Sequence, residues 1–202
     1  IDKKYLNKEK IGVTEFLSLR SRIKKNSEVM LIKSRNFAVS PLTTHIDIRD
    51  VPKKLSSNLI ITKAKTIEKD YKKIFKKKPR IGILGLNPHN AEFRKNSEEK
   101  KIIKPAILKL KKLGIRAEGP LVADTVFLND YKKYDVILGM YHDQVLAPFK
   151  ALFKFDAINL TLGLKYLRVS PDHGTAKKMI SLKKANPTSL INCVNFINKF
   201  GQ

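Results

Sequence analysis

Cysteine and acidic residues are scarce in this sequence, and long apolar runs are missing from it. The single cysteine, Cys193, cannot form a disulfide within the chain, which favours a reducing, cytoplasmic setting. No apolar run approaches the roughly 18 residues that a membrane-spanning helix needs, so we expect no membrane span. The opening residues, from Ile1 onward, contain no apolar segment, twin arginine or cleavage pattern, so they predict no targeting signal.

The 18 Asp and Glu residues are outnumbered by 42 Lys and Arg residues, which gives a formal net charge of +24. Such an excess of cations is typical of proteins that bind phosphate backbones. The lysines, however, are spread through expected helices and turns, without aromatic interleaving, zinc-finger spacing or an RNP-type motif. We therefore interpret the charge as a solvated, lysine-rich surface. A basic nucleic-acid-binding protein remains the alternative from a different functional class.

Apolar segments of strand length alternate with amphipathic helical patterns along the chain. Residues 80–86 and 134–140 are continuous apolar runs, which are typical of strands covered on both faces. Helical spacing predicts one long helix over residues 52–78 and another over 97–114, with a bend or interruption at Pro105. These features predict an α/β fold with a largely parallel central sheet, and 42% hydrophobic content is enough for its core.

Three of the four histidines follow expected strands, namely His45, His89 and His142. Ligands of open α/β sheets bind outside the carboxyl ends of the strands. Three neutral imidazoles with an open position would bind a divalent ion such as zinc, which could then polarise a hydroxyl or carbonyl oxygen. Their spacing is not a local motif, so the sequence leaves open whether they converge.

Several charged residues accompany these histidines. Asp143 and Asp124 could ligate a metal or orient a ligand, and for Asp143 an N-cap of a helix over 144–150 is an equally good explanation. Lys150 and Arg168 end apolar segments and suit a phosphate or carboxylate, although Lys150 is also explained as an ordinary exposed base.

A further candidate is the segment Ser-Pro-Asp-His-Gly-Thr-Ala at residues 170–176, before an expected short helix. Backbone N–H groups at such a position could receive a phosphate or a nucleotide. No G-x-G-x-x-G follows any strand, so the standard dinucleotide fingerprint is absent. The residues alone thus predict an α/β enzyme with an anionic substrate and a possible metal.

Five segments occur in order: TTHIDIRDV, LGLNPHNAE, GPLVADTVF, YDVILGMYHDQVLAPFK and AINLTLGLKYLRVSPDHGTA. Together they resemble the 4-hydroxythreonine-4-phosphate dehydrogenase (PdxA) family of vitamin B6 biosynthesis. The resemblance implies a fold like that of isocitrate and isopropylmalate dehydrogenases, with two α/β lobes and an active site in the cleft and at a homodimer interface. Residues 1–202 would be a partial catalytic region, the C-terminal two-thirds of the family's chain, with no separate second domain.

The resemblance also implies a reaction. The family oxidises 4-hydroxythreonine-4-phosphate with NAD(P)+ and releases CO2 to give 3-amino-2-oxopropyl phosphate, with a divalent metal (Zn2+, Mg2+, Mn2+ or Co2+). These enzymes bind NAD without the glycine fingerprint, which would explain its absence here. Because the family's N-terminal third is missing, we expect the 202-residue piece to be poorly stable or inactive alone.

Site residues carry over position by position. The resemblance implies metal ligands contributed by both subunits, substrate-binding residues, a nucleotide loop, and two carboxylates that line the same site. The implied metal ligands are His45, His89 and His142, and the implied substrate-binding residues are Thr14, Lys150, Asn159 and Arg168. The nucleotide loop comprises Asp172, His173, Gly174, Thr175 and Ala176. The two carboxylates are Asp124 and Asp143.

Two departures from the family pattern stand out. Val13 occupies the position where the family commonly has a histidine that contacts substrate. Asn90, Ala91 and Glu92 replace the usual Ala-Gly-Glu followed by glycines, which predicts an altered loop after His89. Val13 keeps open an alternative, a related dehydrogenase that acts on another phosphorylated hydroxy acid.

Overall fold

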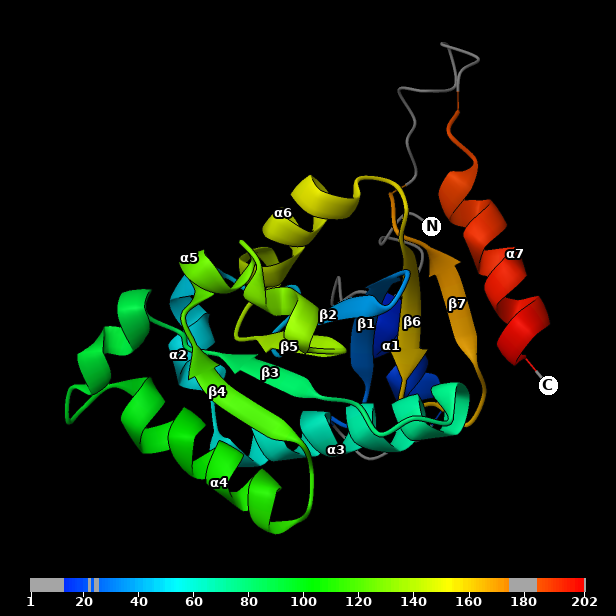
Figure 1. The fold of residues 1–202 in the computed structure, drawn as a ribbon. Coiled ribbons are helices and arrows are strands. Elements are labelled where there is room, and N and C mark those ends of the chain that lie inside the picture. Colours follow the sequence, from blue (N-terminus) through cyan, green and yellow to red (C-terminus); the bar gives the residue numbers. More distant parts are fainter. Residues whose placement is uncertain (1–12, 22, 24–25, 175–184, 202) are drawn as a thin grey trace.

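The chain folds around one seven-stranded mixed sheet with the strand order β4-β3-β5-β2-β1-β6-β7 (Figure 1). The structure, a computed structural model, describes residues 13–21, 23, 26–174 and 185–201. The strands are β1 (Val29–Ser34), β2 (Phe37–Pro41), β3 (Ile81–Leu84), β4 (Ala117–Leu121), β5 (Val136–Gly139), β6 (Ile158–Leu162) and β7 (Arg168–Pro171).

The first four strands of this order, β4, β3, β5 and β2, run parallel to one another. The rest of the sheet is antiparallel, because β1 pairs antiparallel with both β2 and β6, and β6 with β7. Every residue of β3 and β5 is buried, as the continuous apolar runs predicted. The α/β fold class is confirmed, and its parallel strands bring their carboxyl ends to one edge of the sheet.

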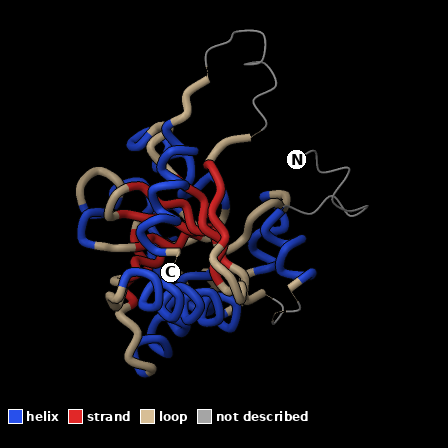
Figure 2. The backbone as a smooth tube through the Cα atoms, turned by 90° about the vertical axis from the view of Figure 1, so that its right-hand side faces the viewer, coloured by secondary structure: helices blue, strands red, loops and turns tan. Residues whose placement is uncertain are grey.

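Helices cover both faces of the sheet, as Figures 1 and 2 show. One face packs against α3 (Ser57–Phe75), α4 (Lys104–Lys112) and α7 (Thr188–Phe200), and the other against α5 (Ala123–Val126) and α6 (His142–Phe153). The helices α1 (Val13–Arg20) and α2 (Val51–Lys54) complete the α-helices of the described residues. None of the described helices is both long and apolar enough to cross a membrane.

The single helix expected over 52–78 is wrong, because the chain forms two helices there. The backbone between α2 and α3 is extended at Leu55 and Ser56. The Ser56 hydroxyl accepts a hydrogen bond from the Leu59 N–H at 3.2 Å and so caps the start of α3. The helix ends where Lys76 adopts a left-handed conformation with φ of 53°. A serine cap thus decides the break that the apolar spacing alone did not reveal.

The interruption expected at Pro105 lies at a change of helix type. A π-helical turn, Glu99–Ile103, leads into α4, and Pro105 occupies the first turn of α4. Proline is tolerated there because the N–H groups of a first turn have no partner within the helix.

Candidate active site

The three histidines predicted as metal ligands all follow parallel strands. His45 comes after β2, His89 after β3, and His142 is the first residue of α6 directly after β5. Since β3, β5 and β2 are neighbours in that order, the three residues lie along the same carboxyl edge of the sheet. The expectation that these histidines follow strand ends is therefore confirmed, while their role in binding metal stays a prediction.

A cavity of about 370 Å³ opens beside α6, β6 and β7. Most of the predicted site residues line it, together with an apolar wall. The first group is His45, His142, Lys150, Asn159, Arg168, Asp172, His173 and Gly174, and the apolar wall comprises Val13, Met30, Ile32 and Leu146. Thr14 lies in α1 and its side chain is outside the described part, as are Thr175 and Ala176.

The imidazoles of His45 and His142 face the same cavity, with ring centroids 5.7 Å apart. The Nδ1 of His142 lies 2.7 Å from the Oδ1 of Asp143. A carboxylate can only accept, so in the neutral imidazole Nδ1 carries the proton and Nε2 presents a lone pair. The N-cap alternative for Asp143 is wrong, because α6 starts at His142, two residues before the expected Gln144, with Tyr141 at the cap position. Asp143 instead orients His142.

His89 and Asp124 do not line this cavity. His89 is exposed in the loop after β3, and Asp124 is exposed in the first turn of α5. Within the described residues, no three or more His, Cys, Asp or Glu side chains are grouped closely enough to hold a metal ion. Two of the three predicted imidazoles therefore come together in one chain, and the third does not.

The polar wall of the cavity contains two cations in different states. The Lys150 ammonium lies 2.8 Å from Asp172 Oδ2 and also donates to the Asp172 carbonyl, so its charge is compensated. Arg168 donates to the Thr161 hydroxyl at 3.0 Å, and no described carboxylate pairs with it. Burial lowers the pKa of the Arg168 guanidinium, which still remains charged at neutral pH. Arg168 is the cation best placed to meet an anion.

Asn159, on β6, contributes an unusual acceptor to the same wall. Its Oδ1 is buried and has no hydrogen-bond partner among the described residues. A buried carbonyl oxygen without a partner costs roughly 1–3 kcal/mol. A hydroxyl or ammonium group of a ligand in the cavity would satisfy it, which supports the predicted role of Asn159 in substrate binding.

Glu99 supports the loop that carries His89, a role that sequence reasoning missed. Its side chain is fully buried, and its Oε1 accepts the backbone N–H groups of Leu86 and Asn87 at 2.8 Å each. Burial alone would raise the pKa of Glu99, but these hydrogen bonds, joined by the Asn87 amide, lower it below its ordinary value. The sequence offered only a weak signal, an acid at the start of a helix, which also fits an exposed first turn.

Gln144 links the ends of β3 and β5, and it too was missed. Its Oε1 accepts the Met140 N–H and its Nε2 donates to the Gly85 carbonyl, both at 2.7 Å. The close packing continues at Gly139, where an added Cβ would lie 2.4 Å from Val145 Cγ1. One amide thus ties the loop before His89 to the strand end before His142.

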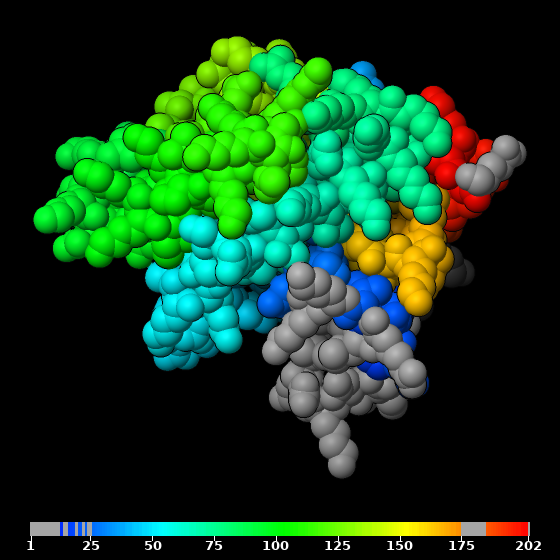
Figure 3. Space-filling view, turned by 90° about the horizontal axis from the view of Figure 1, so that it is seen from below, coloured from blue at the N-terminus to red at the C-terminus, as the bar shows by residue number. Residues whose placement is uncertain are grey.

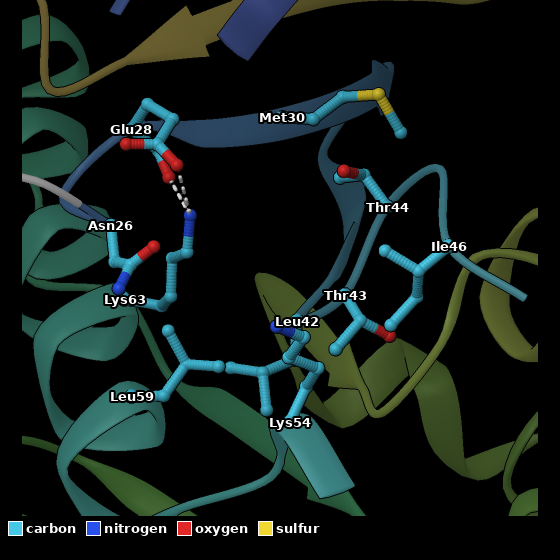
Figure 4. A pocket seen from close by; sticks show the side chains of 10 residues that line it. All are labelled: Asn26, Glu28, Met30, Leu42, Thr43, Thr44, Ile46, Lys54, Leu59 and Lys63. Carbon is cyan, nitrogen blue, oxygen red and sulfur yellow. Dashed lines mark hydrogen bonds and ion pairs between the residues drawn. The ribbon is translucent and has the colours of Figure 1, made fainter. Parts of the chain in front are cut away.

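A second cavity, also about 370 Å³, lies at the same edge of the sheet and shares Met30 with the first. Figure 4 shows the Lys63 ammonium pointing toward Glu28, whose Oε1 it meets at 3.2 Å. Lys63 also donates to the Glu28 backbone carbonyl. Its charge is therefore used within the fold, and the cavity is a less suitable anion site than the one that Arg168 lines.

Comparison with known proteins places this site in context. The model of the family described as pyridoxal phosphate biosynthetic protein PdxA matches residues 1–197. Relatives named 4-hydroxythreonine-4-phosphate dehydrogenase, from Sulfurihydrogenibium and Aquifex aeolicus, are 41% and 42% identical over 91% and 92% of this chain. The chain spans only 56% and 58% of their lengths.

A crystal structure agrees with these relatives. The 4-hydroxythreonine-4-phosphate dehydrogenase of Klebsiella pneumoniae has 32% sequence identity and a TM-score of 0.78, covering 91% of this chain and 56% of that one. Sequence and fold thus point to the same group of proteins, and the chain belongs to the PdxA family of pyridoxal phosphate biosynthetic proteins.

Proposed function

We propose that this chain forms part of an oxidoreductase that oxidises and decarboxylates 4-hydroxythreonine-4-phosphate to 3-amino-2-oxopropyl phosphate during pyridoxal phosphate biosynthesis. The proposal treats residues 1–202 as one partial catalytic region. One observation carries it: a single cavity joins two strand-end imidazoles to Arg168, Lys150 and Asn159. Family membership disfavours the nucleic-acid-binding alternative.

The two imidazoles in the cavity would supply two of the ligands of a divalent metal, with a third to come from outside the cavity. His142 presents Nε2 because Asp143 holds its other nitrogen, and His45 lies on the facing side at 5.7 Å between ring centroids. When bound there, a Zn2+, Mg2+, Mn2+ or Co2+ ion would supply Lewis acidity at the oxygen of the substrate's hydroxyl group. Asp143 acts as a positioning residue in this scheme, since it sets the tautomer and direction of His142.

The remaining polar residues would bind and orient the substrate. Arg168 has no carboxylate partner among the described residues, so it would take the phosphate or the carboxylate in a bidentate contact. The unpartnered Asn159 oxygen would accept from the substrate's ammonium or hydroxyl group. Lys150 is held by Asp172, which keeps both next to the segment that leads into the nucleotide loop.

We propose that NAD(P)+ binds along Asp172, His173 and Gly174, which line the cavity next to the substrate residues. Gly174 supports this, because no atom of the described residues, its chain neighbours aside, lies within 4 Å of where a Cβ would be, so a ligand can approach its backbone. Thr175 and Ala176 belong to the same proposed loop and lie outside the described residues. The nicotinamide would accept the hydride from the substrate's secondary alcohol.

We also propose that the site is completed in a homodimer in the cytoplasm. His89 is exposed at the same sheet edge but outside the cavity, which suits a ligand given to a neighbouring subunit's site. Asp124 lies in the first turn of α5, which follows the carboxyl end of β4 at the same sheet edge, and we assign it to the shared interface.

The test is NADH or NADPH formation from 4-hydroxythreonine-4-phosphate by the protein that carries this chain, with and without a chelator. We expect turnover that a chelator abolishes and that added divalent metal restores. A folded, metal-loaded dimer without any turnover would contradict the proposed substrate.

Val13 favours a second candidate function, the oxidation of another phosphorylated hydroxy acid. It lines the cavity where the family pattern has a histidine, and Met30 and Leu146 extend its apolar wall. Such a wall offers no polar contact to a substrate. If the substrate is the family's own, Val13→His should improve kcat/KM for it; if it is a phosphorylated four-carbon acid, the wild type should prefer that acid and Val13→His should reduce the preference.

A further inference from the structure

A third cavity, of about 290 Å³, lies on the face of the sheet that packs against α7, whereas the candidate active site lies on the face covered by α6. It opens where β1 ends and β6 begins, under the C-terminal half of α7, which Figure 1 shows standing beside β7. Three cations line it, Lys33, Arg35 and Lys199. The view in Figure 3 shows the end of α7 at the margin of the surface formed by α3 and α4.

The one carboxylate in this cavity is already engaged. Asp156 pairs with Arg35 at 3.2 Å through Oδ2, and the Ser34 hydroxyl donates to the same oxygen at 3.3 Å. The Asn192 amide donates to its other oxygen at 2.8 Å. The charge of Asp156 is therefore shared among existing partners, and the three cations outnumber it.

Lys33 is the buried member of these three cations, whereas Arg35 and Lys199 are exposed. The residue is 9% exposed, its ammonium donates to the Arg35 carbonyl, and its Nζ lies 5.1 Å from the centroid of the Phe75 ring. No described carboxylate lies within ion-pair distance of it. Burial, with Lys199 and Lys77 nearby, lowers the pKa of Lys33 to about 8, although Asp135 acts in the opposite direction. An anion in the cavity would remove this penalty.

The other side of the cavity is apolar and aromatic. Phe196 and Phe200 line it with Ile158, and their ring centroids are 4.8 Å apart. Phe75 packs against both rings, at 5.9 and 5.3 Å. Aromatic faces receive flat, ring-shaped groups, whereas the cations opposite would receive a negative group.

We propose that this cavity binds a small molecule that carries a phosphate group on a ring-sized apolar body, at a site separate from the candidate active site. Lys33 and Lys199 meet the phosphate, the Asn195 amide at the rim can donate to it, and Phe196 and Phe200 contact the ring. The site is distinct from the one lined by Arg168, because the two cavities share no residue and lie on opposite faces of the sheet.

The test is calorimetric titration of phenyl phosphate into the folded protein carrying Arg168→Gln, so that the candidate active site keeps Lys150, which Asp172 compensates, but lacks its other cation. We expect saturable binding that Lys33→Met weakens roughly tenfold, since one charge-assisted hydrogen bond is lost. Phenol, which lacks the anion, and inorganic phosphate, which lacks the ring, should bind more weakly than phenyl phosphate. Lys112→Gln, on the exposed face of α4, is the matched control and should bind as the parent does.

Lys199→Gln keeps the test decisive if the buried Lys33 cannot be replaced without unfolding the protein. Lys199 is exposed on α7, so its substitution should leave the fold intact and weaken phenyl phosphate binding several-fold. Binding that neither substitution weakens, or the absence of binding in the Arg168→Gln background, would overturn the proposal.

Discussion

The carboxyl edge of the sheet has two halves that differ in how complete they are. Around β5, α6, β6 and β7, the predicted residues converge on one cavity within a single chain. Around β3 and α5, His89 and Asp124 are exposed and line no part of that cavity. Apart from His45 and part of the apolar wall, the first half consists of segments close in sequence, from His142 to Gly174, whereas the residues of the second half need another surface to form a site. We infer that a second subunit supplies that surface.

The largest expected effect on activity comes from substituting one histidine in each half and then mixing the two variants. We expect His142→Ala and His89→Ala each to lower kcat/KM by roughly a thousandfold or more, because each removes a proposed metal ligand. If the ligands come from different subunits, a mixed dimer of the two variants contains one intact site. Co-refolding equal amounts should then restore about a quarter of wild-type activity, by random pairing of subunits in a symmetric dimer.

Dimers of each variant alone serve as the controls and should stay inactive. If the co-refolded sample is no more active than the two controls, both histidines serve the same subunit's site, or His89 has no part in it. Either result would contradict the comparison drawn between the two halves.

A smaller effect is expected inside the complete half. Arg168→Gln should lower kcat/KM by roughly ten- to a hundredfold, mainly through KM, because it removes a charge-assisted contact to the anionic substrate. Lys112→Gln removes an exposed cation far from the cavity and should have no effect. Steady-state kinetics with the melting temperature of each variant would separate this loss from misfolding. If KM is unchanged in Arg168→Gln, Arg168 does not bind the substrate.

Glu99 tests how the incomplete half is held in place. Glu99→Gln should lower the free energy of unfolding at pH 7 by about 1–3 kcal/mol, since a buried carboxylate that accepts two backbone N–H groups is lost. The pKa of Glu99 is below its ordinary value of 4.5 in the folded protein, so its contribution is full above that pH. It is lost as the pH falls through the lowered pKa.

Urea unfolding of wild type and Glu99→Gln between pH 7 and pH 3 measures this difference. We expect the difference in free energy of unfolding between wild type and Glu99→Gln to become smaller as the pH falls. Glu98→Gln is the control, because Glu98 accepts only the Asn87 side-chain amide and should cost less. If this difference in free energy of unfolding stays constant or grows as the pH falls, the ionised carboxylate of Glu99 does not stabilise the fold.

The sequence was enough to predict features that depend on local apolar spacing or on short motifs in a fixed order along the chain. The buried β3 and β5 strands and the positions of His45 and His142 after strands are confirmed. The start of α6 was predicted wrongly because a strand-end histidine and the following aspartate suit either a helix start or a cap.

The supporting contacts could not be predicted for a different physical reason. Glu99 and Gln144 act through hydrogen bonds to backbone atoms of Leu86 and Gly85, which are far away in sequence. Such bonds depend on how the strands are ordered, and neither residue type nor spacing reports that order. The third cavity was missed likewise, since Lys33 and Lys199 are 166 positions apart and resemble the chain's many surface lysines.

The smallest effect concerns the backbone after His89, where this chain departs from the family pattern. Residues His89–Phe93 all have positive φ, and Ala91 has φ of 49° at the position where the pattern has glycine. Left-handed conformation costs an alanine roughly 1–2 kcal/mol. Glycine would relieve that strain but loses a buried methyl group and gains freedom in the unfolded chain. We therefore expect Ala91→Gly to raise the free energy of unfolding by about 0.5 kcal/mol.

Ala106→Gly provides the matched control, because Ala106 is also buried but helical within α4. There the same substitution should lower the free energy of unfolding by about 1 kcal/mol or more, since glycine is a poor helix former. Urea unfolding of the two variants beside wild type gives the comparison, and opposite signs are the expected result. If Ala91→Gly destabilises the protein as much as Ala106→Gly does, the loop after His89 stores no strain, and its left-handed backbone cannot be the reason that the family pattern has glycine there.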